Sequence, residues 1–209
     1  MVYLYCEEVT LYLLLKVNIP KASKPKKEFG PTCIETYSGN VFDVVKPDCS
    51  LITPEDIAHS LSLQCRFNGH TEDFYSVAEH CIRVHDAMAY DNHTETVRIA
   101  GLLHDASEAY VCDIPRPVKQ ALRGYKELED RVQKQVWLRF NVNVTEETEQ
   151  IVKAYDEIML CAEAKHLMPS RGEGWGYDYI KDRDIFIVPM LPNVAKREFL
   201  YRLSLYALY

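Results

Sequence analysis

Residues 102–108 read Leu102-Leu103-His104-Asp105-Ala106-Ser107-Glu108 and place a histidine and two carboxylates in an otherwise apolar, helical pattern. Burying a carboxylate without a partner costs several kcal/mol, so a His-Asp pair in such a helix needs an explanation. Glu108 follows His104 by four residues and Asp105 by three, which places it over the same helix face. Imidazole and carboxylate are both good ligands for zinc, cobalt or manganese, and a bound divalent metal accounts for their burial.

A His-Asp step also arises by chance, and His85-Asp86 is expected to be an exposed example. Two further residues strengthen the metal interpretation of the pair at 104–105. His80 lies among small and apolar residues, where a lone histidine is usually an ordinary core residue. Asp156 lies on the predicted buried stripe of a later helix, where an unpaired aspartate is not expected. Three separate helices thus each direct a metal-type ligand inward, which predicts a metal site of His80, His104, Asp105 and Asp156.

The wider pattern predicts an all-α domain with one short extended passage near its start. Ser38-Gly39-Asn40 reads as a turn between extended pieces at 34–37 and 41–45. Four residues read as helix N-caps: Thr53, Ser76, Thr94 and Thr145. Helices are predicted over residues 54–63, 77–90, from 94 through His104, 125–140, 145–168 and 192–209, with a glycine-rich loop at 170–177.

The first 30 residues read as an N-terminal extension of a domain formed by residues 31–209. A β-leaning opening leads into Lys21-Ala22-Ser23-Lys24-Pro25-Lys26-Lys27, which is basic and has no hydrophobic period. Short charged runs of this kind are usually solvated, so a linker or terminal arm is favoured over a functional basic patch.

Composition excludes several classes of protein. The 209 residues are 47% hydrophobic and 26% charged, which suits one domain and excludes a mainly disordered chain. The net charge of −7 carries no signature of a nucleic-acid binder. The seven cysteines are scattered without a C-x-x-C pair, which favours a reducing compartment over a disulfide framework or a zinc-thiolate site. No apolar stretch near the start is long enough to span a membrane, so we expect a cytoplasmic protein without membrane or nucleic-acid partners.

The order His … His-Asp … Asp resembles that of the HD-domain metal-dependent phosphohydrolases. Three strings resemble the bacterial 5′-deoxynucleotidases: Ser76-Val77-Ala78-Glu79-His80, then His104-Asp105-Ala106-Ser107-Glu108, then Asp113-Ile114-Pro115-Arg116-Pro117-Val118-Lys119. The block Cys65-Arg66-Phe67-Asn68-Gly69-His70, between residues 56–59 and 74–80, is similar to phage-encoded HD phosphohydrolases. That branch includes enzymes that hydrolyse dATP to deoxyadenosine and triphosphate. The similarity covers roughly residues 34–168.

The resemblance implies an HD-domain helical bundle that acts on a deoxynucleotide and tends to form homo-oligomers. The residue pattern adds a short N-terminal extended arm or hairpin to this bundle. By position it assigns these roles: metal binding to His80, His104, Asp105 and Asp156; proton handling to Glu108; phosphate contacts to Arg66 and Lys119; and closure over the sugar to Asp113 and Pro115. The catalytic candidates are therefore Glu108 and the ligand Asp105. The chain departs from the 5′-deoxynucleotidases at Phe67, where they have tryptophan after the arginine, so base selection can differ.

The chemistry of a phosphate ester suits these residue types. Water is a poor nucleophile at neutral pH, and a metal lowers the pKa of bound water to about 7. Glu108 can orient or deprotonate that water, Arg66 can clamp a phosphate with paired N–H donors, and Lys119 supplies a point charge. The expected cofactor is a divalent metal: zinc, cobalt or manganese, with magnesium as a further candidate.

The substrate stays open between several classes. We expect cleavage of the 5′-phosphoester of a deoxynucleotide, with adenine favoured by the phage resemblance, releasing deoxynucleoside and either phosphate or triphosphate. The alternatives are a 5′-deoxynucleotidase restricted to monophosphates, a non-catalytic nucleotide sensor, and an enzyme for cyclic nucleotides or a guanosine alarmone. His70 is expected either to contact substrate or to make a structural hydrogen bond. Trp175 is expected to pack its loop rather than to stack on a base.

Overall fold

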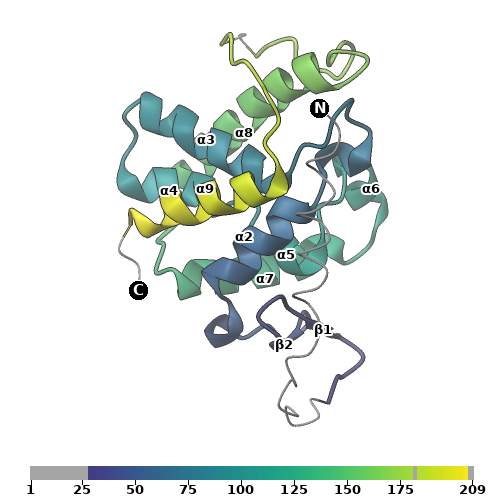
Figure 1. The fold of residues 1–209 in the computed structure, drawn as a ribbon, viewed down its shortest axis with the longest axis vertical. Helices are drawn as coiled ribbons and strands as arrows, with labels where there is room; N and C mark the ends of the chain where they lie inside the picture. The colour runs from purple at the N-terminus through teal and green to yellow at the C-terminus, as the bar shows by residue number, and fades with distance from the viewer. Residues whose placement is uncertain (1–27, 181–182, 207–209) are drawn as a thin grey trace, which may run out of the picture.

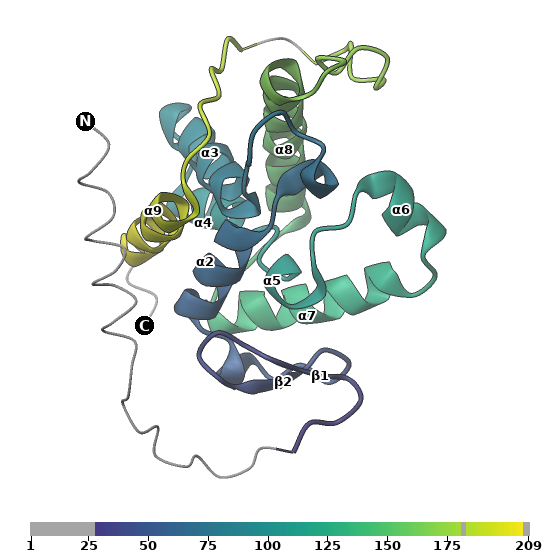
Figure 2. The same cartoon turned by 45° about the vertical axis from the view of Figure 1, so that its right-hand side comes forward.

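The computed structural model describes residues 28–180 and 183–206, which form a mostly helical domain with a small two-stranded sheet (Figures 1 and 2). The all-α prediction is therefore confirmed at the level of fold class, with the hairpin as the extended passage. The predicted extension falls almost wholly on residues 1–27, which lie outside the described residues.

The two strands form an antiparallel hairpin at the edge of the helical domain. Strand β1 (Cys33–Glu35) pairs with β2 (Val41–Asp43) on either side of the predicted turn. The turn is fixed to the helices because Ser38 donates from its backbone N–H and its hydroxyl to the two Asp56 carboxylate oxygens, at 2.6 and 2.8 Å. Phe42 is fully buried and stacks on Tyr110 with ring centroids 4.2 Å apart.

The main helices begin at the N-caps that the sequence predicts. Thr53, Ser76, Thr94 and Thr145 each accept a hydrogen bond from a first-turn backbone N–H, which satisfies one of the donors that a helix start leaves unpaired. These caps start α2 (Pro54–Leu63), α3 (Val77–Tyr90), α4 (Glu95–Leu103) and α8 (Glu146–Leu167). The remaining elements are η1 (Cys49–Leu51), η2 (Arg66–Gly69), α5 (Glu108–Val111), α6 (Arg116–Ala121), α7 (Tyr125–Arg139) and α9 (Pro192–Ser204).

Helix α3 lies at the centre of the packing and contacts α2, α4, α8 and α9 (Figure 1). Helices α3 and α4 approach closely at Gly101, where a Cβ atom would lie 2.5 Å from the Sδ atom of buried Met88. Gly101 is one turn before His104, so the residue that permits close packing also brings the end of α4 next to His80 on α3. The buried stripe of α8 contains Val152, Tyr155 and Met159, as the sequence predicts.

The sequence did not predict the short helix α6, and three other details differ from its prediction. Helix α4 ends at Leu103 and α5 begins only at Glu108, so His104-Asp105 lies between two helices rather than inside one. Tight turns connect α4 to α5 through this pair. Ala106 N–H donates to Leu103 O and Glu108 N–H donates to Asp105 O, both at 3.0 Å. Successive α-helical residues point about 100° apart, and this break lets two adjacent side chains face one point.

The other two differences concern the C-terminal helix. His85, predicted to be exposed, is only 4% exposed because its Nε2 lies 2.6 Å from the Tyr206 hydroxyl and its Nδ1 lies 2.8 Å from Asp86 Oδ1. Helix α9 ends at Ser204 rather than near residue 209, and residues 207–209 lie outside the described residues.

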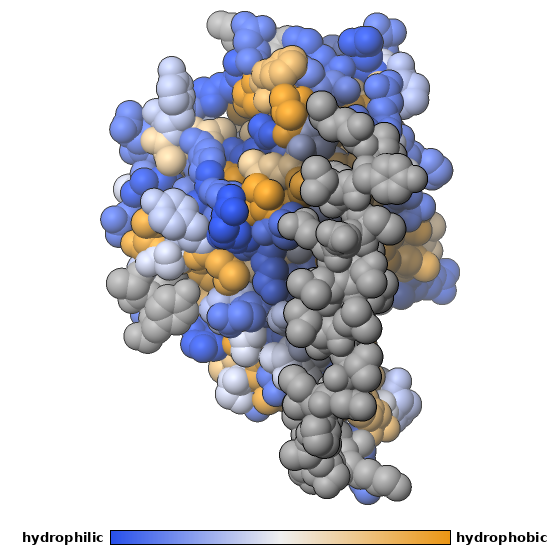
Figure 3. All heavy atoms as spheres, in the orientation of Figure 1, coloured by the Kyte–Doolittle hydropathy of each residue, from blue (hydrophilic) through white to orange (hydrophobic). Residues whose placement is uncertain are grey.

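None of the helices within residues 28–180 and 183–206 combines the length and the apolar character that crossing a membrane requires. The face in Figure 3 is largely hydrophilic and is interrupted by hydrophobic patches. Large apolar side chains exposed on the described chain include Phe186, Val188 and Leu191. The expected homo-oligomer stays a prediction.

The first testable prediction concerns the link between α3 and α9. Arg202 donates from Nε and Nη2 to the two Asp86 carboxylate oxygens, at 2.7 and 2.6 Å. Burial alone would raise the pKa of Asp86, but the hydrogen bonds from His85 and Arg202 outweigh it and lower the pKa. A carboxyl with a lowered folded-state pKa stabilises the protein above its unfolded pKa of about 3.9 and loses that contribution as pH falls through the folded value.

Asp86→Asn should therefore lower the free energy of unfolding by up to about 1 kcal/mol at pH 7, because the carboxylate is partly exposed and screened. The difference from wild type should shrink as the pH falls toward 3 in urea denaturation. Asp73→Asn, at an exposed position, serves as the matched control. An equal loss at pH 7 and at pH 3 would contradict a charge-dependent link.

Candidate metal centre

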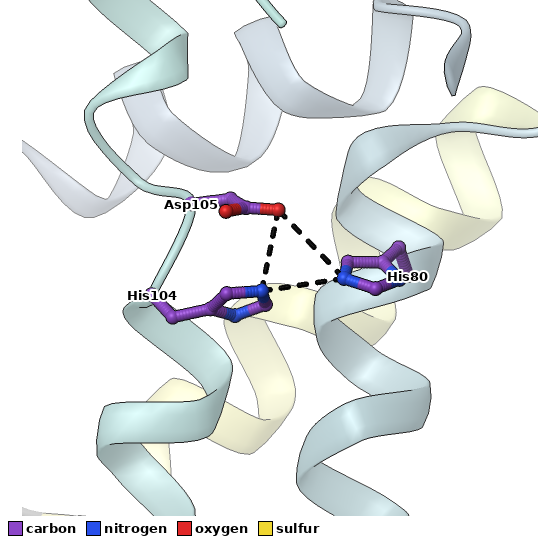
Figure 4. A group of neighbouring side chains, drawn as sticks. All are labelled: His80, His104 and Asp105. Atoms are coloured by element: carbon purple, nitrogen blue, oxygen red, sulfur yellow. Dashed lines mark hydrogen bonds and ion pairs between the residues drawn. The ribbon is translucent and has the colours of Figure 1, made fainter. Parts of the chain in front are cut away.

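Three ligand-type side chains converge where α3 meets the end of α4. His80 Nε2, His104 Nε2 and Asp105 Oδ2 all lie within 4.8 Å of one another. Figure 4 shows the three side chains facing one point. The two nitrogens are 3.2 Å apart, and Asp105 Oδ2 lies 3.3 Å from His104 Nε2 and 3.7 Å from His80 Nε2. His80 comes from α3, His104 directly follows the last residue of α4, and Asp105 lies in the same turn (Figure 4).

The fourth predicted ligand, Asp156, reaches the same point from α8. Its Oδ1 lies 3.1 Å from His80 Nε2 and 3.9 Å from His104 Nε2. Burial alone would raise the pKa of Asp156, but its bond to His80 and the charges of both histidines lower it, so the carboxyl is ionised. The structure thus brings together all four side chains that the sequence predicts to share one site.

The Nδ1 atoms of His80 and His104, which face away from the cluster, are hydrogen-bonded to acceptors. His80 Nδ1 lies 2.6 Å from Glu163 Oε1, and His104 Nδ1 lies 2.8 Å from the Gly101 carbonyl oxygen. A carboxylate and a carbonyl only accept, so each Nδ1 carries the proton and each Nε2 of a neutral ring presents a lone pair. When both rings are neutral, two nitrogen lone pairs and two carboxylate oxygens face one point with no donor among them. This donor set suits a divalent metal, since imidazole nitrogen and carboxylate oxygen are its usual ligands.

The carboxylates gathered around His80 attract a proton as well as a metal ion. Burial and the charge of Arg66 lower the pKa of His80, but Glu163 and the bond to Asp156 outweigh them and raise it to about 9. A proton and a metal therefore compete for this point.

Glu163 is the main functional residue that the sequence interpretation missed. It is fully buried on α8, where it accepts hydrogen bonds from Arg66 Nε at 3.1 Å and the Tyr75 hydroxyl at 2.8 Å, besides its contact with His80. Burial alone would raise its pKa, but Arg66 and His80 lower it and keep the carboxyl ionised. A signal was available, because Glu163 follows Asp156 by two helical turns and lies on the same face.

Arg66 lies next to the cluster, between the carboxylates of Asp105 and Glu163. It is 9% exposed, and its Nη1 lies 3.6 Å from Asp105 Oδ2 while its Nε donates to Glu163. The residues that follow it, Phe67 and Asn68, have φ values of 54° and 55° in the left-handed region. Non-glycine residues adopt this conformation at a free-energy cost, and such strain clusters at functional sites.

A second charged group lies beside the cluster. Lys119 Nζ donates to Glu108 Oε1 at 2.9 Å and to Glu129 Oε1 at 2.6 Å. Glu108 is 3% exposed, and its Oε2 is buried without a hydrogen-bond partner among the described residues. Burial and the charges of Asp105 and Asp113 raise the pKa of Glu108 well above its ordinary value, against the opposing effect of Lys119. Glu108 is thus a carboxyl suited to exchanging a proton, and Glu129 is a partner that the sequence interpretation missed.

The three remaining predicted site residues occupy the margin of this group. Asp113 is half-buried, its backbone N–H donates to Gln64, and burial and the charge of Asp105 raise its pKa, with Arg66 and Lys119 opposing. Pro115 precedes α6, and its carbonyl accepts from Lys119 N–H, so it begins the helix that carries that cation. His70 ends η2 and is exposed, and within the described part of the chain no hydrogen bond joins its side chain to the cluster.

Comparison with known proteins finds close relatives. The uncharacterized protein YfdR from Escherichia coli K12 is 34% identical over 173 residues, which cover 82% of this chain and 93% of YfdR. The chain belongs to the YfdR family. A second family member, the uncharacterized protein RCAP_rcc00048 from Rhodobacter capsulatus, is 39% identical over 137 residues, which cover 62% of this chain and 70% of the relative. No family model matches the chain.

The second prediction tests the support that Glu163 gives in this YfdR-family protein. Glu163→Ala leaves Arg66 and His80 without their shared buried partner, and removing one member of a buried ion pair typically costs about 3–5 kcal/mol. We expect a loss of that size in urea denaturation with a chelator present, so that metal binding does not contribute. Glu149→Ala, at an exposed position of the same helix, should change stability by less than about 0.5 kcal/mol. Equal stability of the two variants would contradict this role of Glu163.

Proposed function

We propose that this YfdR-family protein is an HD-type, metal-dependent phosphohydrolase that cleaves the 5′-phosphoester of deoxynucleotides. One observation carries the proposal: two histidine Nε2 atoms and two aspartate oxygens meet at one point while both Nδ1 atoms are bonded to acceptors. The order of these ligands along the chain adds support, because it resembles that of the HD phosphohydrolases.

His80, His104, Asp105 and Asp156 would hold the divalent metal, with zinc, cobalt and manganese as the first candidates. The chemistry supplied by such a bound ion is Lewis acidity, which activates water near neutral pH and offsets charge on a phosphoryl oxygen. Glu163 orients the first ligand by holding the proton on His80 Nδ1, as partners behind metal-bound histidines commonly do.

The surrounding residues supply the remaining chemistry. The described contacts of Arg66 use Nε and Nη1, so its other amino group is available to a phosphate oxygen. Glu108 takes a proton from the attacking water and passes it to the departing 5′ oxygen of the sugar. Lys119 holds Glu108 in place through its 2.9 Å bond. Asp113, at the margin of the site, would contact the sugar.

In this reaction water attacks the phosphorus nearest the sugar. A bond forms between the water oxygen and phosphorus, the bond from phosphorus to the 5′ oxygen breaks, and the 5′ oxygen receives a proton. The products are a deoxynucleoside and either phosphate from a monophosphate or intact triphosphate from a triphosphate. This pattern separates the proposal from an enzyme that removes terminal phosphates.

The third prediction tests the reaction directly. Purified protein is incubated with dATP, dAMP, ATP or dGTP and with zinc, cobalt, manganese or magnesium, and the products are separated by chromatography. We expect deoxynucleoside together with phosphate or triphosphate, and little turnover of ATP. His104→Ala should lose both bound metal and turnover, whereas His59→Ala, on α2 next to the hairpin, should retain both. Unchanged metal content and turnover in His104→Ala would contradict the proposal.

Glu108→Gln separates an enzyme from a nucleotide sensor at the same site. Because Glu108 is not among the four ligands, the variant should retain metal while kcat falls by about 10²–10⁴-fold, the usual effect of losing a general acid–base. A sensor would instead show thermal stabilisation by nucleotide, and wild type would form no product. Glu108→Gln would then cause no loss of turnover.

A further inference from the structure

The proposed mechanism gives no role to the loop at residues 170–177, which follows α8. Trp175 lies on it between Gly174 and Gly176, whose φ values of 77° and 83° favour glycine. The Trp175 side chain is 36% exposed, so the core does not enclose it. Figure 2 shows this loop on the same side of the molecule as η2 and α6, an arrangement that Figure 1 repeats.

Two contacts connect this loop to two segments at the margin of the candidate site. On one side, the Trp175 ring lies 5.9 Å from the Phe67 ring, and Phe67 directly follows Arg66. On the other side, Arg116 Nη1 donates to the Tyr177 hydroxyl, and Arg116 directly follows Pro115. The loop therefore bridges the two segments to which phosphate and sugar contacts are assigned.

The side chains between the ligand cluster and Trp175 change from charged to aromatic with distance from the cluster. Asp105 contacts the Arg66 guanidinium at 3.6 Å, and that guanidinium lies 5.4 Å from the centre of the Phe67 ring. Phe67 in turn contacts Trp175, so charged groups near the cluster give way to aromatic rings farther out. A nucleotide has the same order, with phosphate at one end and a flat aromatic base at the other. The strained backbone at Phe67, with φ of 54°, is a further mark of a functional segment.

We infer that the 170–177 loop forms a wall of the substrate site and that Trp175 stacks on the nucleobase. The inference rests on the proposed function for its substrate class. Stacking on an aromatic side chain tolerates any base, since every base has a π face, so Trp175 selects for a nucleotide over a sugar phosphate. The Arg116–Tyr177 hydrogen bond holds the loop in the position that this contact needs.

The chain offers its own reporter for this contact. It contains two tryptophans, and the other, Trp137, lies on α7 and packs against the core. Trp137→Phe therefore leaves Trp175 as the single emitter, while Trp175→Phe leaves only Trp137 as the matched control. Deoxyadenosine, which has no phosphate to hydrolyse, should quench emission saturably in Trp137→Phe. It should have no such effect in Trp175→Phe, and 2-deoxyribose should have none in either protein.

Steady-state kinetics supply the second measurement. Stacking that is equal in the bound substrate and in the transition state raises KM when it is lost and leaves kcat unchanged. With the nucleotide that the protein hydrolyses, Trp175→Ala should raise KM about 30-fold, the middle of the range for losing one stacked base. Trp175→Phe keeps an aromatic face and should stay within about twofold of wild type.

The outcomes separate this inference from the proposed function. Hydrolysis with an unchanged KM in Trp175→Ala, and no quenching by deoxyadenosine, overturns the stacking role and leaves the hydrolase in place. Saturable quenching in a protein that hydrolyses no deoxynucleotide retains the stacking role and rejects the hydrolase. Quenching by 2-deoxyribose as strong as by deoxyadenosine also overturns the inference, because the base would not be the group recognised.

Discussion

The site depends on the hydrogen bonds of the His80 imidazole, which is fully buried. One ring nitrogen contacts Glu163 and the other faces the ligand cluster. Glu163 holds the proton on Nδ1, which leaves Nε2 to face His104 and Asp156. That single ring connects α3 with α8 and with the end of α4. The close approach of α3 and α4 at Gly101 makes the contact possible, and the Gly101 carbonyl orients His104 in the same way.

The ligand cluster brings several carboxylates together, which is electrostatically unfavourable. Asp105, Asp156 and Glu163 lie around one histidine, and Glu108 is buried nearby, so like charges oppose one another at low solvent exposure. Arg66 and Lys119 offset part of this repulsion, while burial and the charges of Asp105 and Asp113 raise the pKa of Glu108. Natural proteins tolerate such conflicts mainly where function requires them, and the strained turn after Arg66 belongs to the same region. A divalent cation would relieve the repulsion without any change of fold.

Much of this arrangement follows from short-range features of the sequence. The N-caps and the apolar periodicity predict where α2, α3, α4 and α8 begin, because both depend on residues within one or two turns. The inward stripe of α8 and the isolated polar residues on it point to Asp156 by the same logic. The break after Leu103 was not predicted, since the tight turns that follow it depend on how two packed helices place adjacent side chains at one point.

Contacts between distant segments account for the other misses. His85 is buried because Tyr206, 121 residues later, covers it, and nothing near His85 in the sequence reports that contact. Glu163 gave a usable signal through its spacing from Asp156, but its partners Arg66 and Tyr75 lie 97 and 88 residues away. The contact of Trp175 with Phe67 likewise joins two loops whose proximity only the fold determines.

Anomalous X-ray diffraction from crystals grown with manganese or zinc would locate a bound ion and identify its element. We expect one metal peak whose ligands are His80 Nε2, His104 Nε2 and oxygens of Asp105 and Asp156, at about 2.0–2.2 Å. A metal-soaked crystal with no peak at this point, or with a peak held by other residues alone, would contradict this expectation.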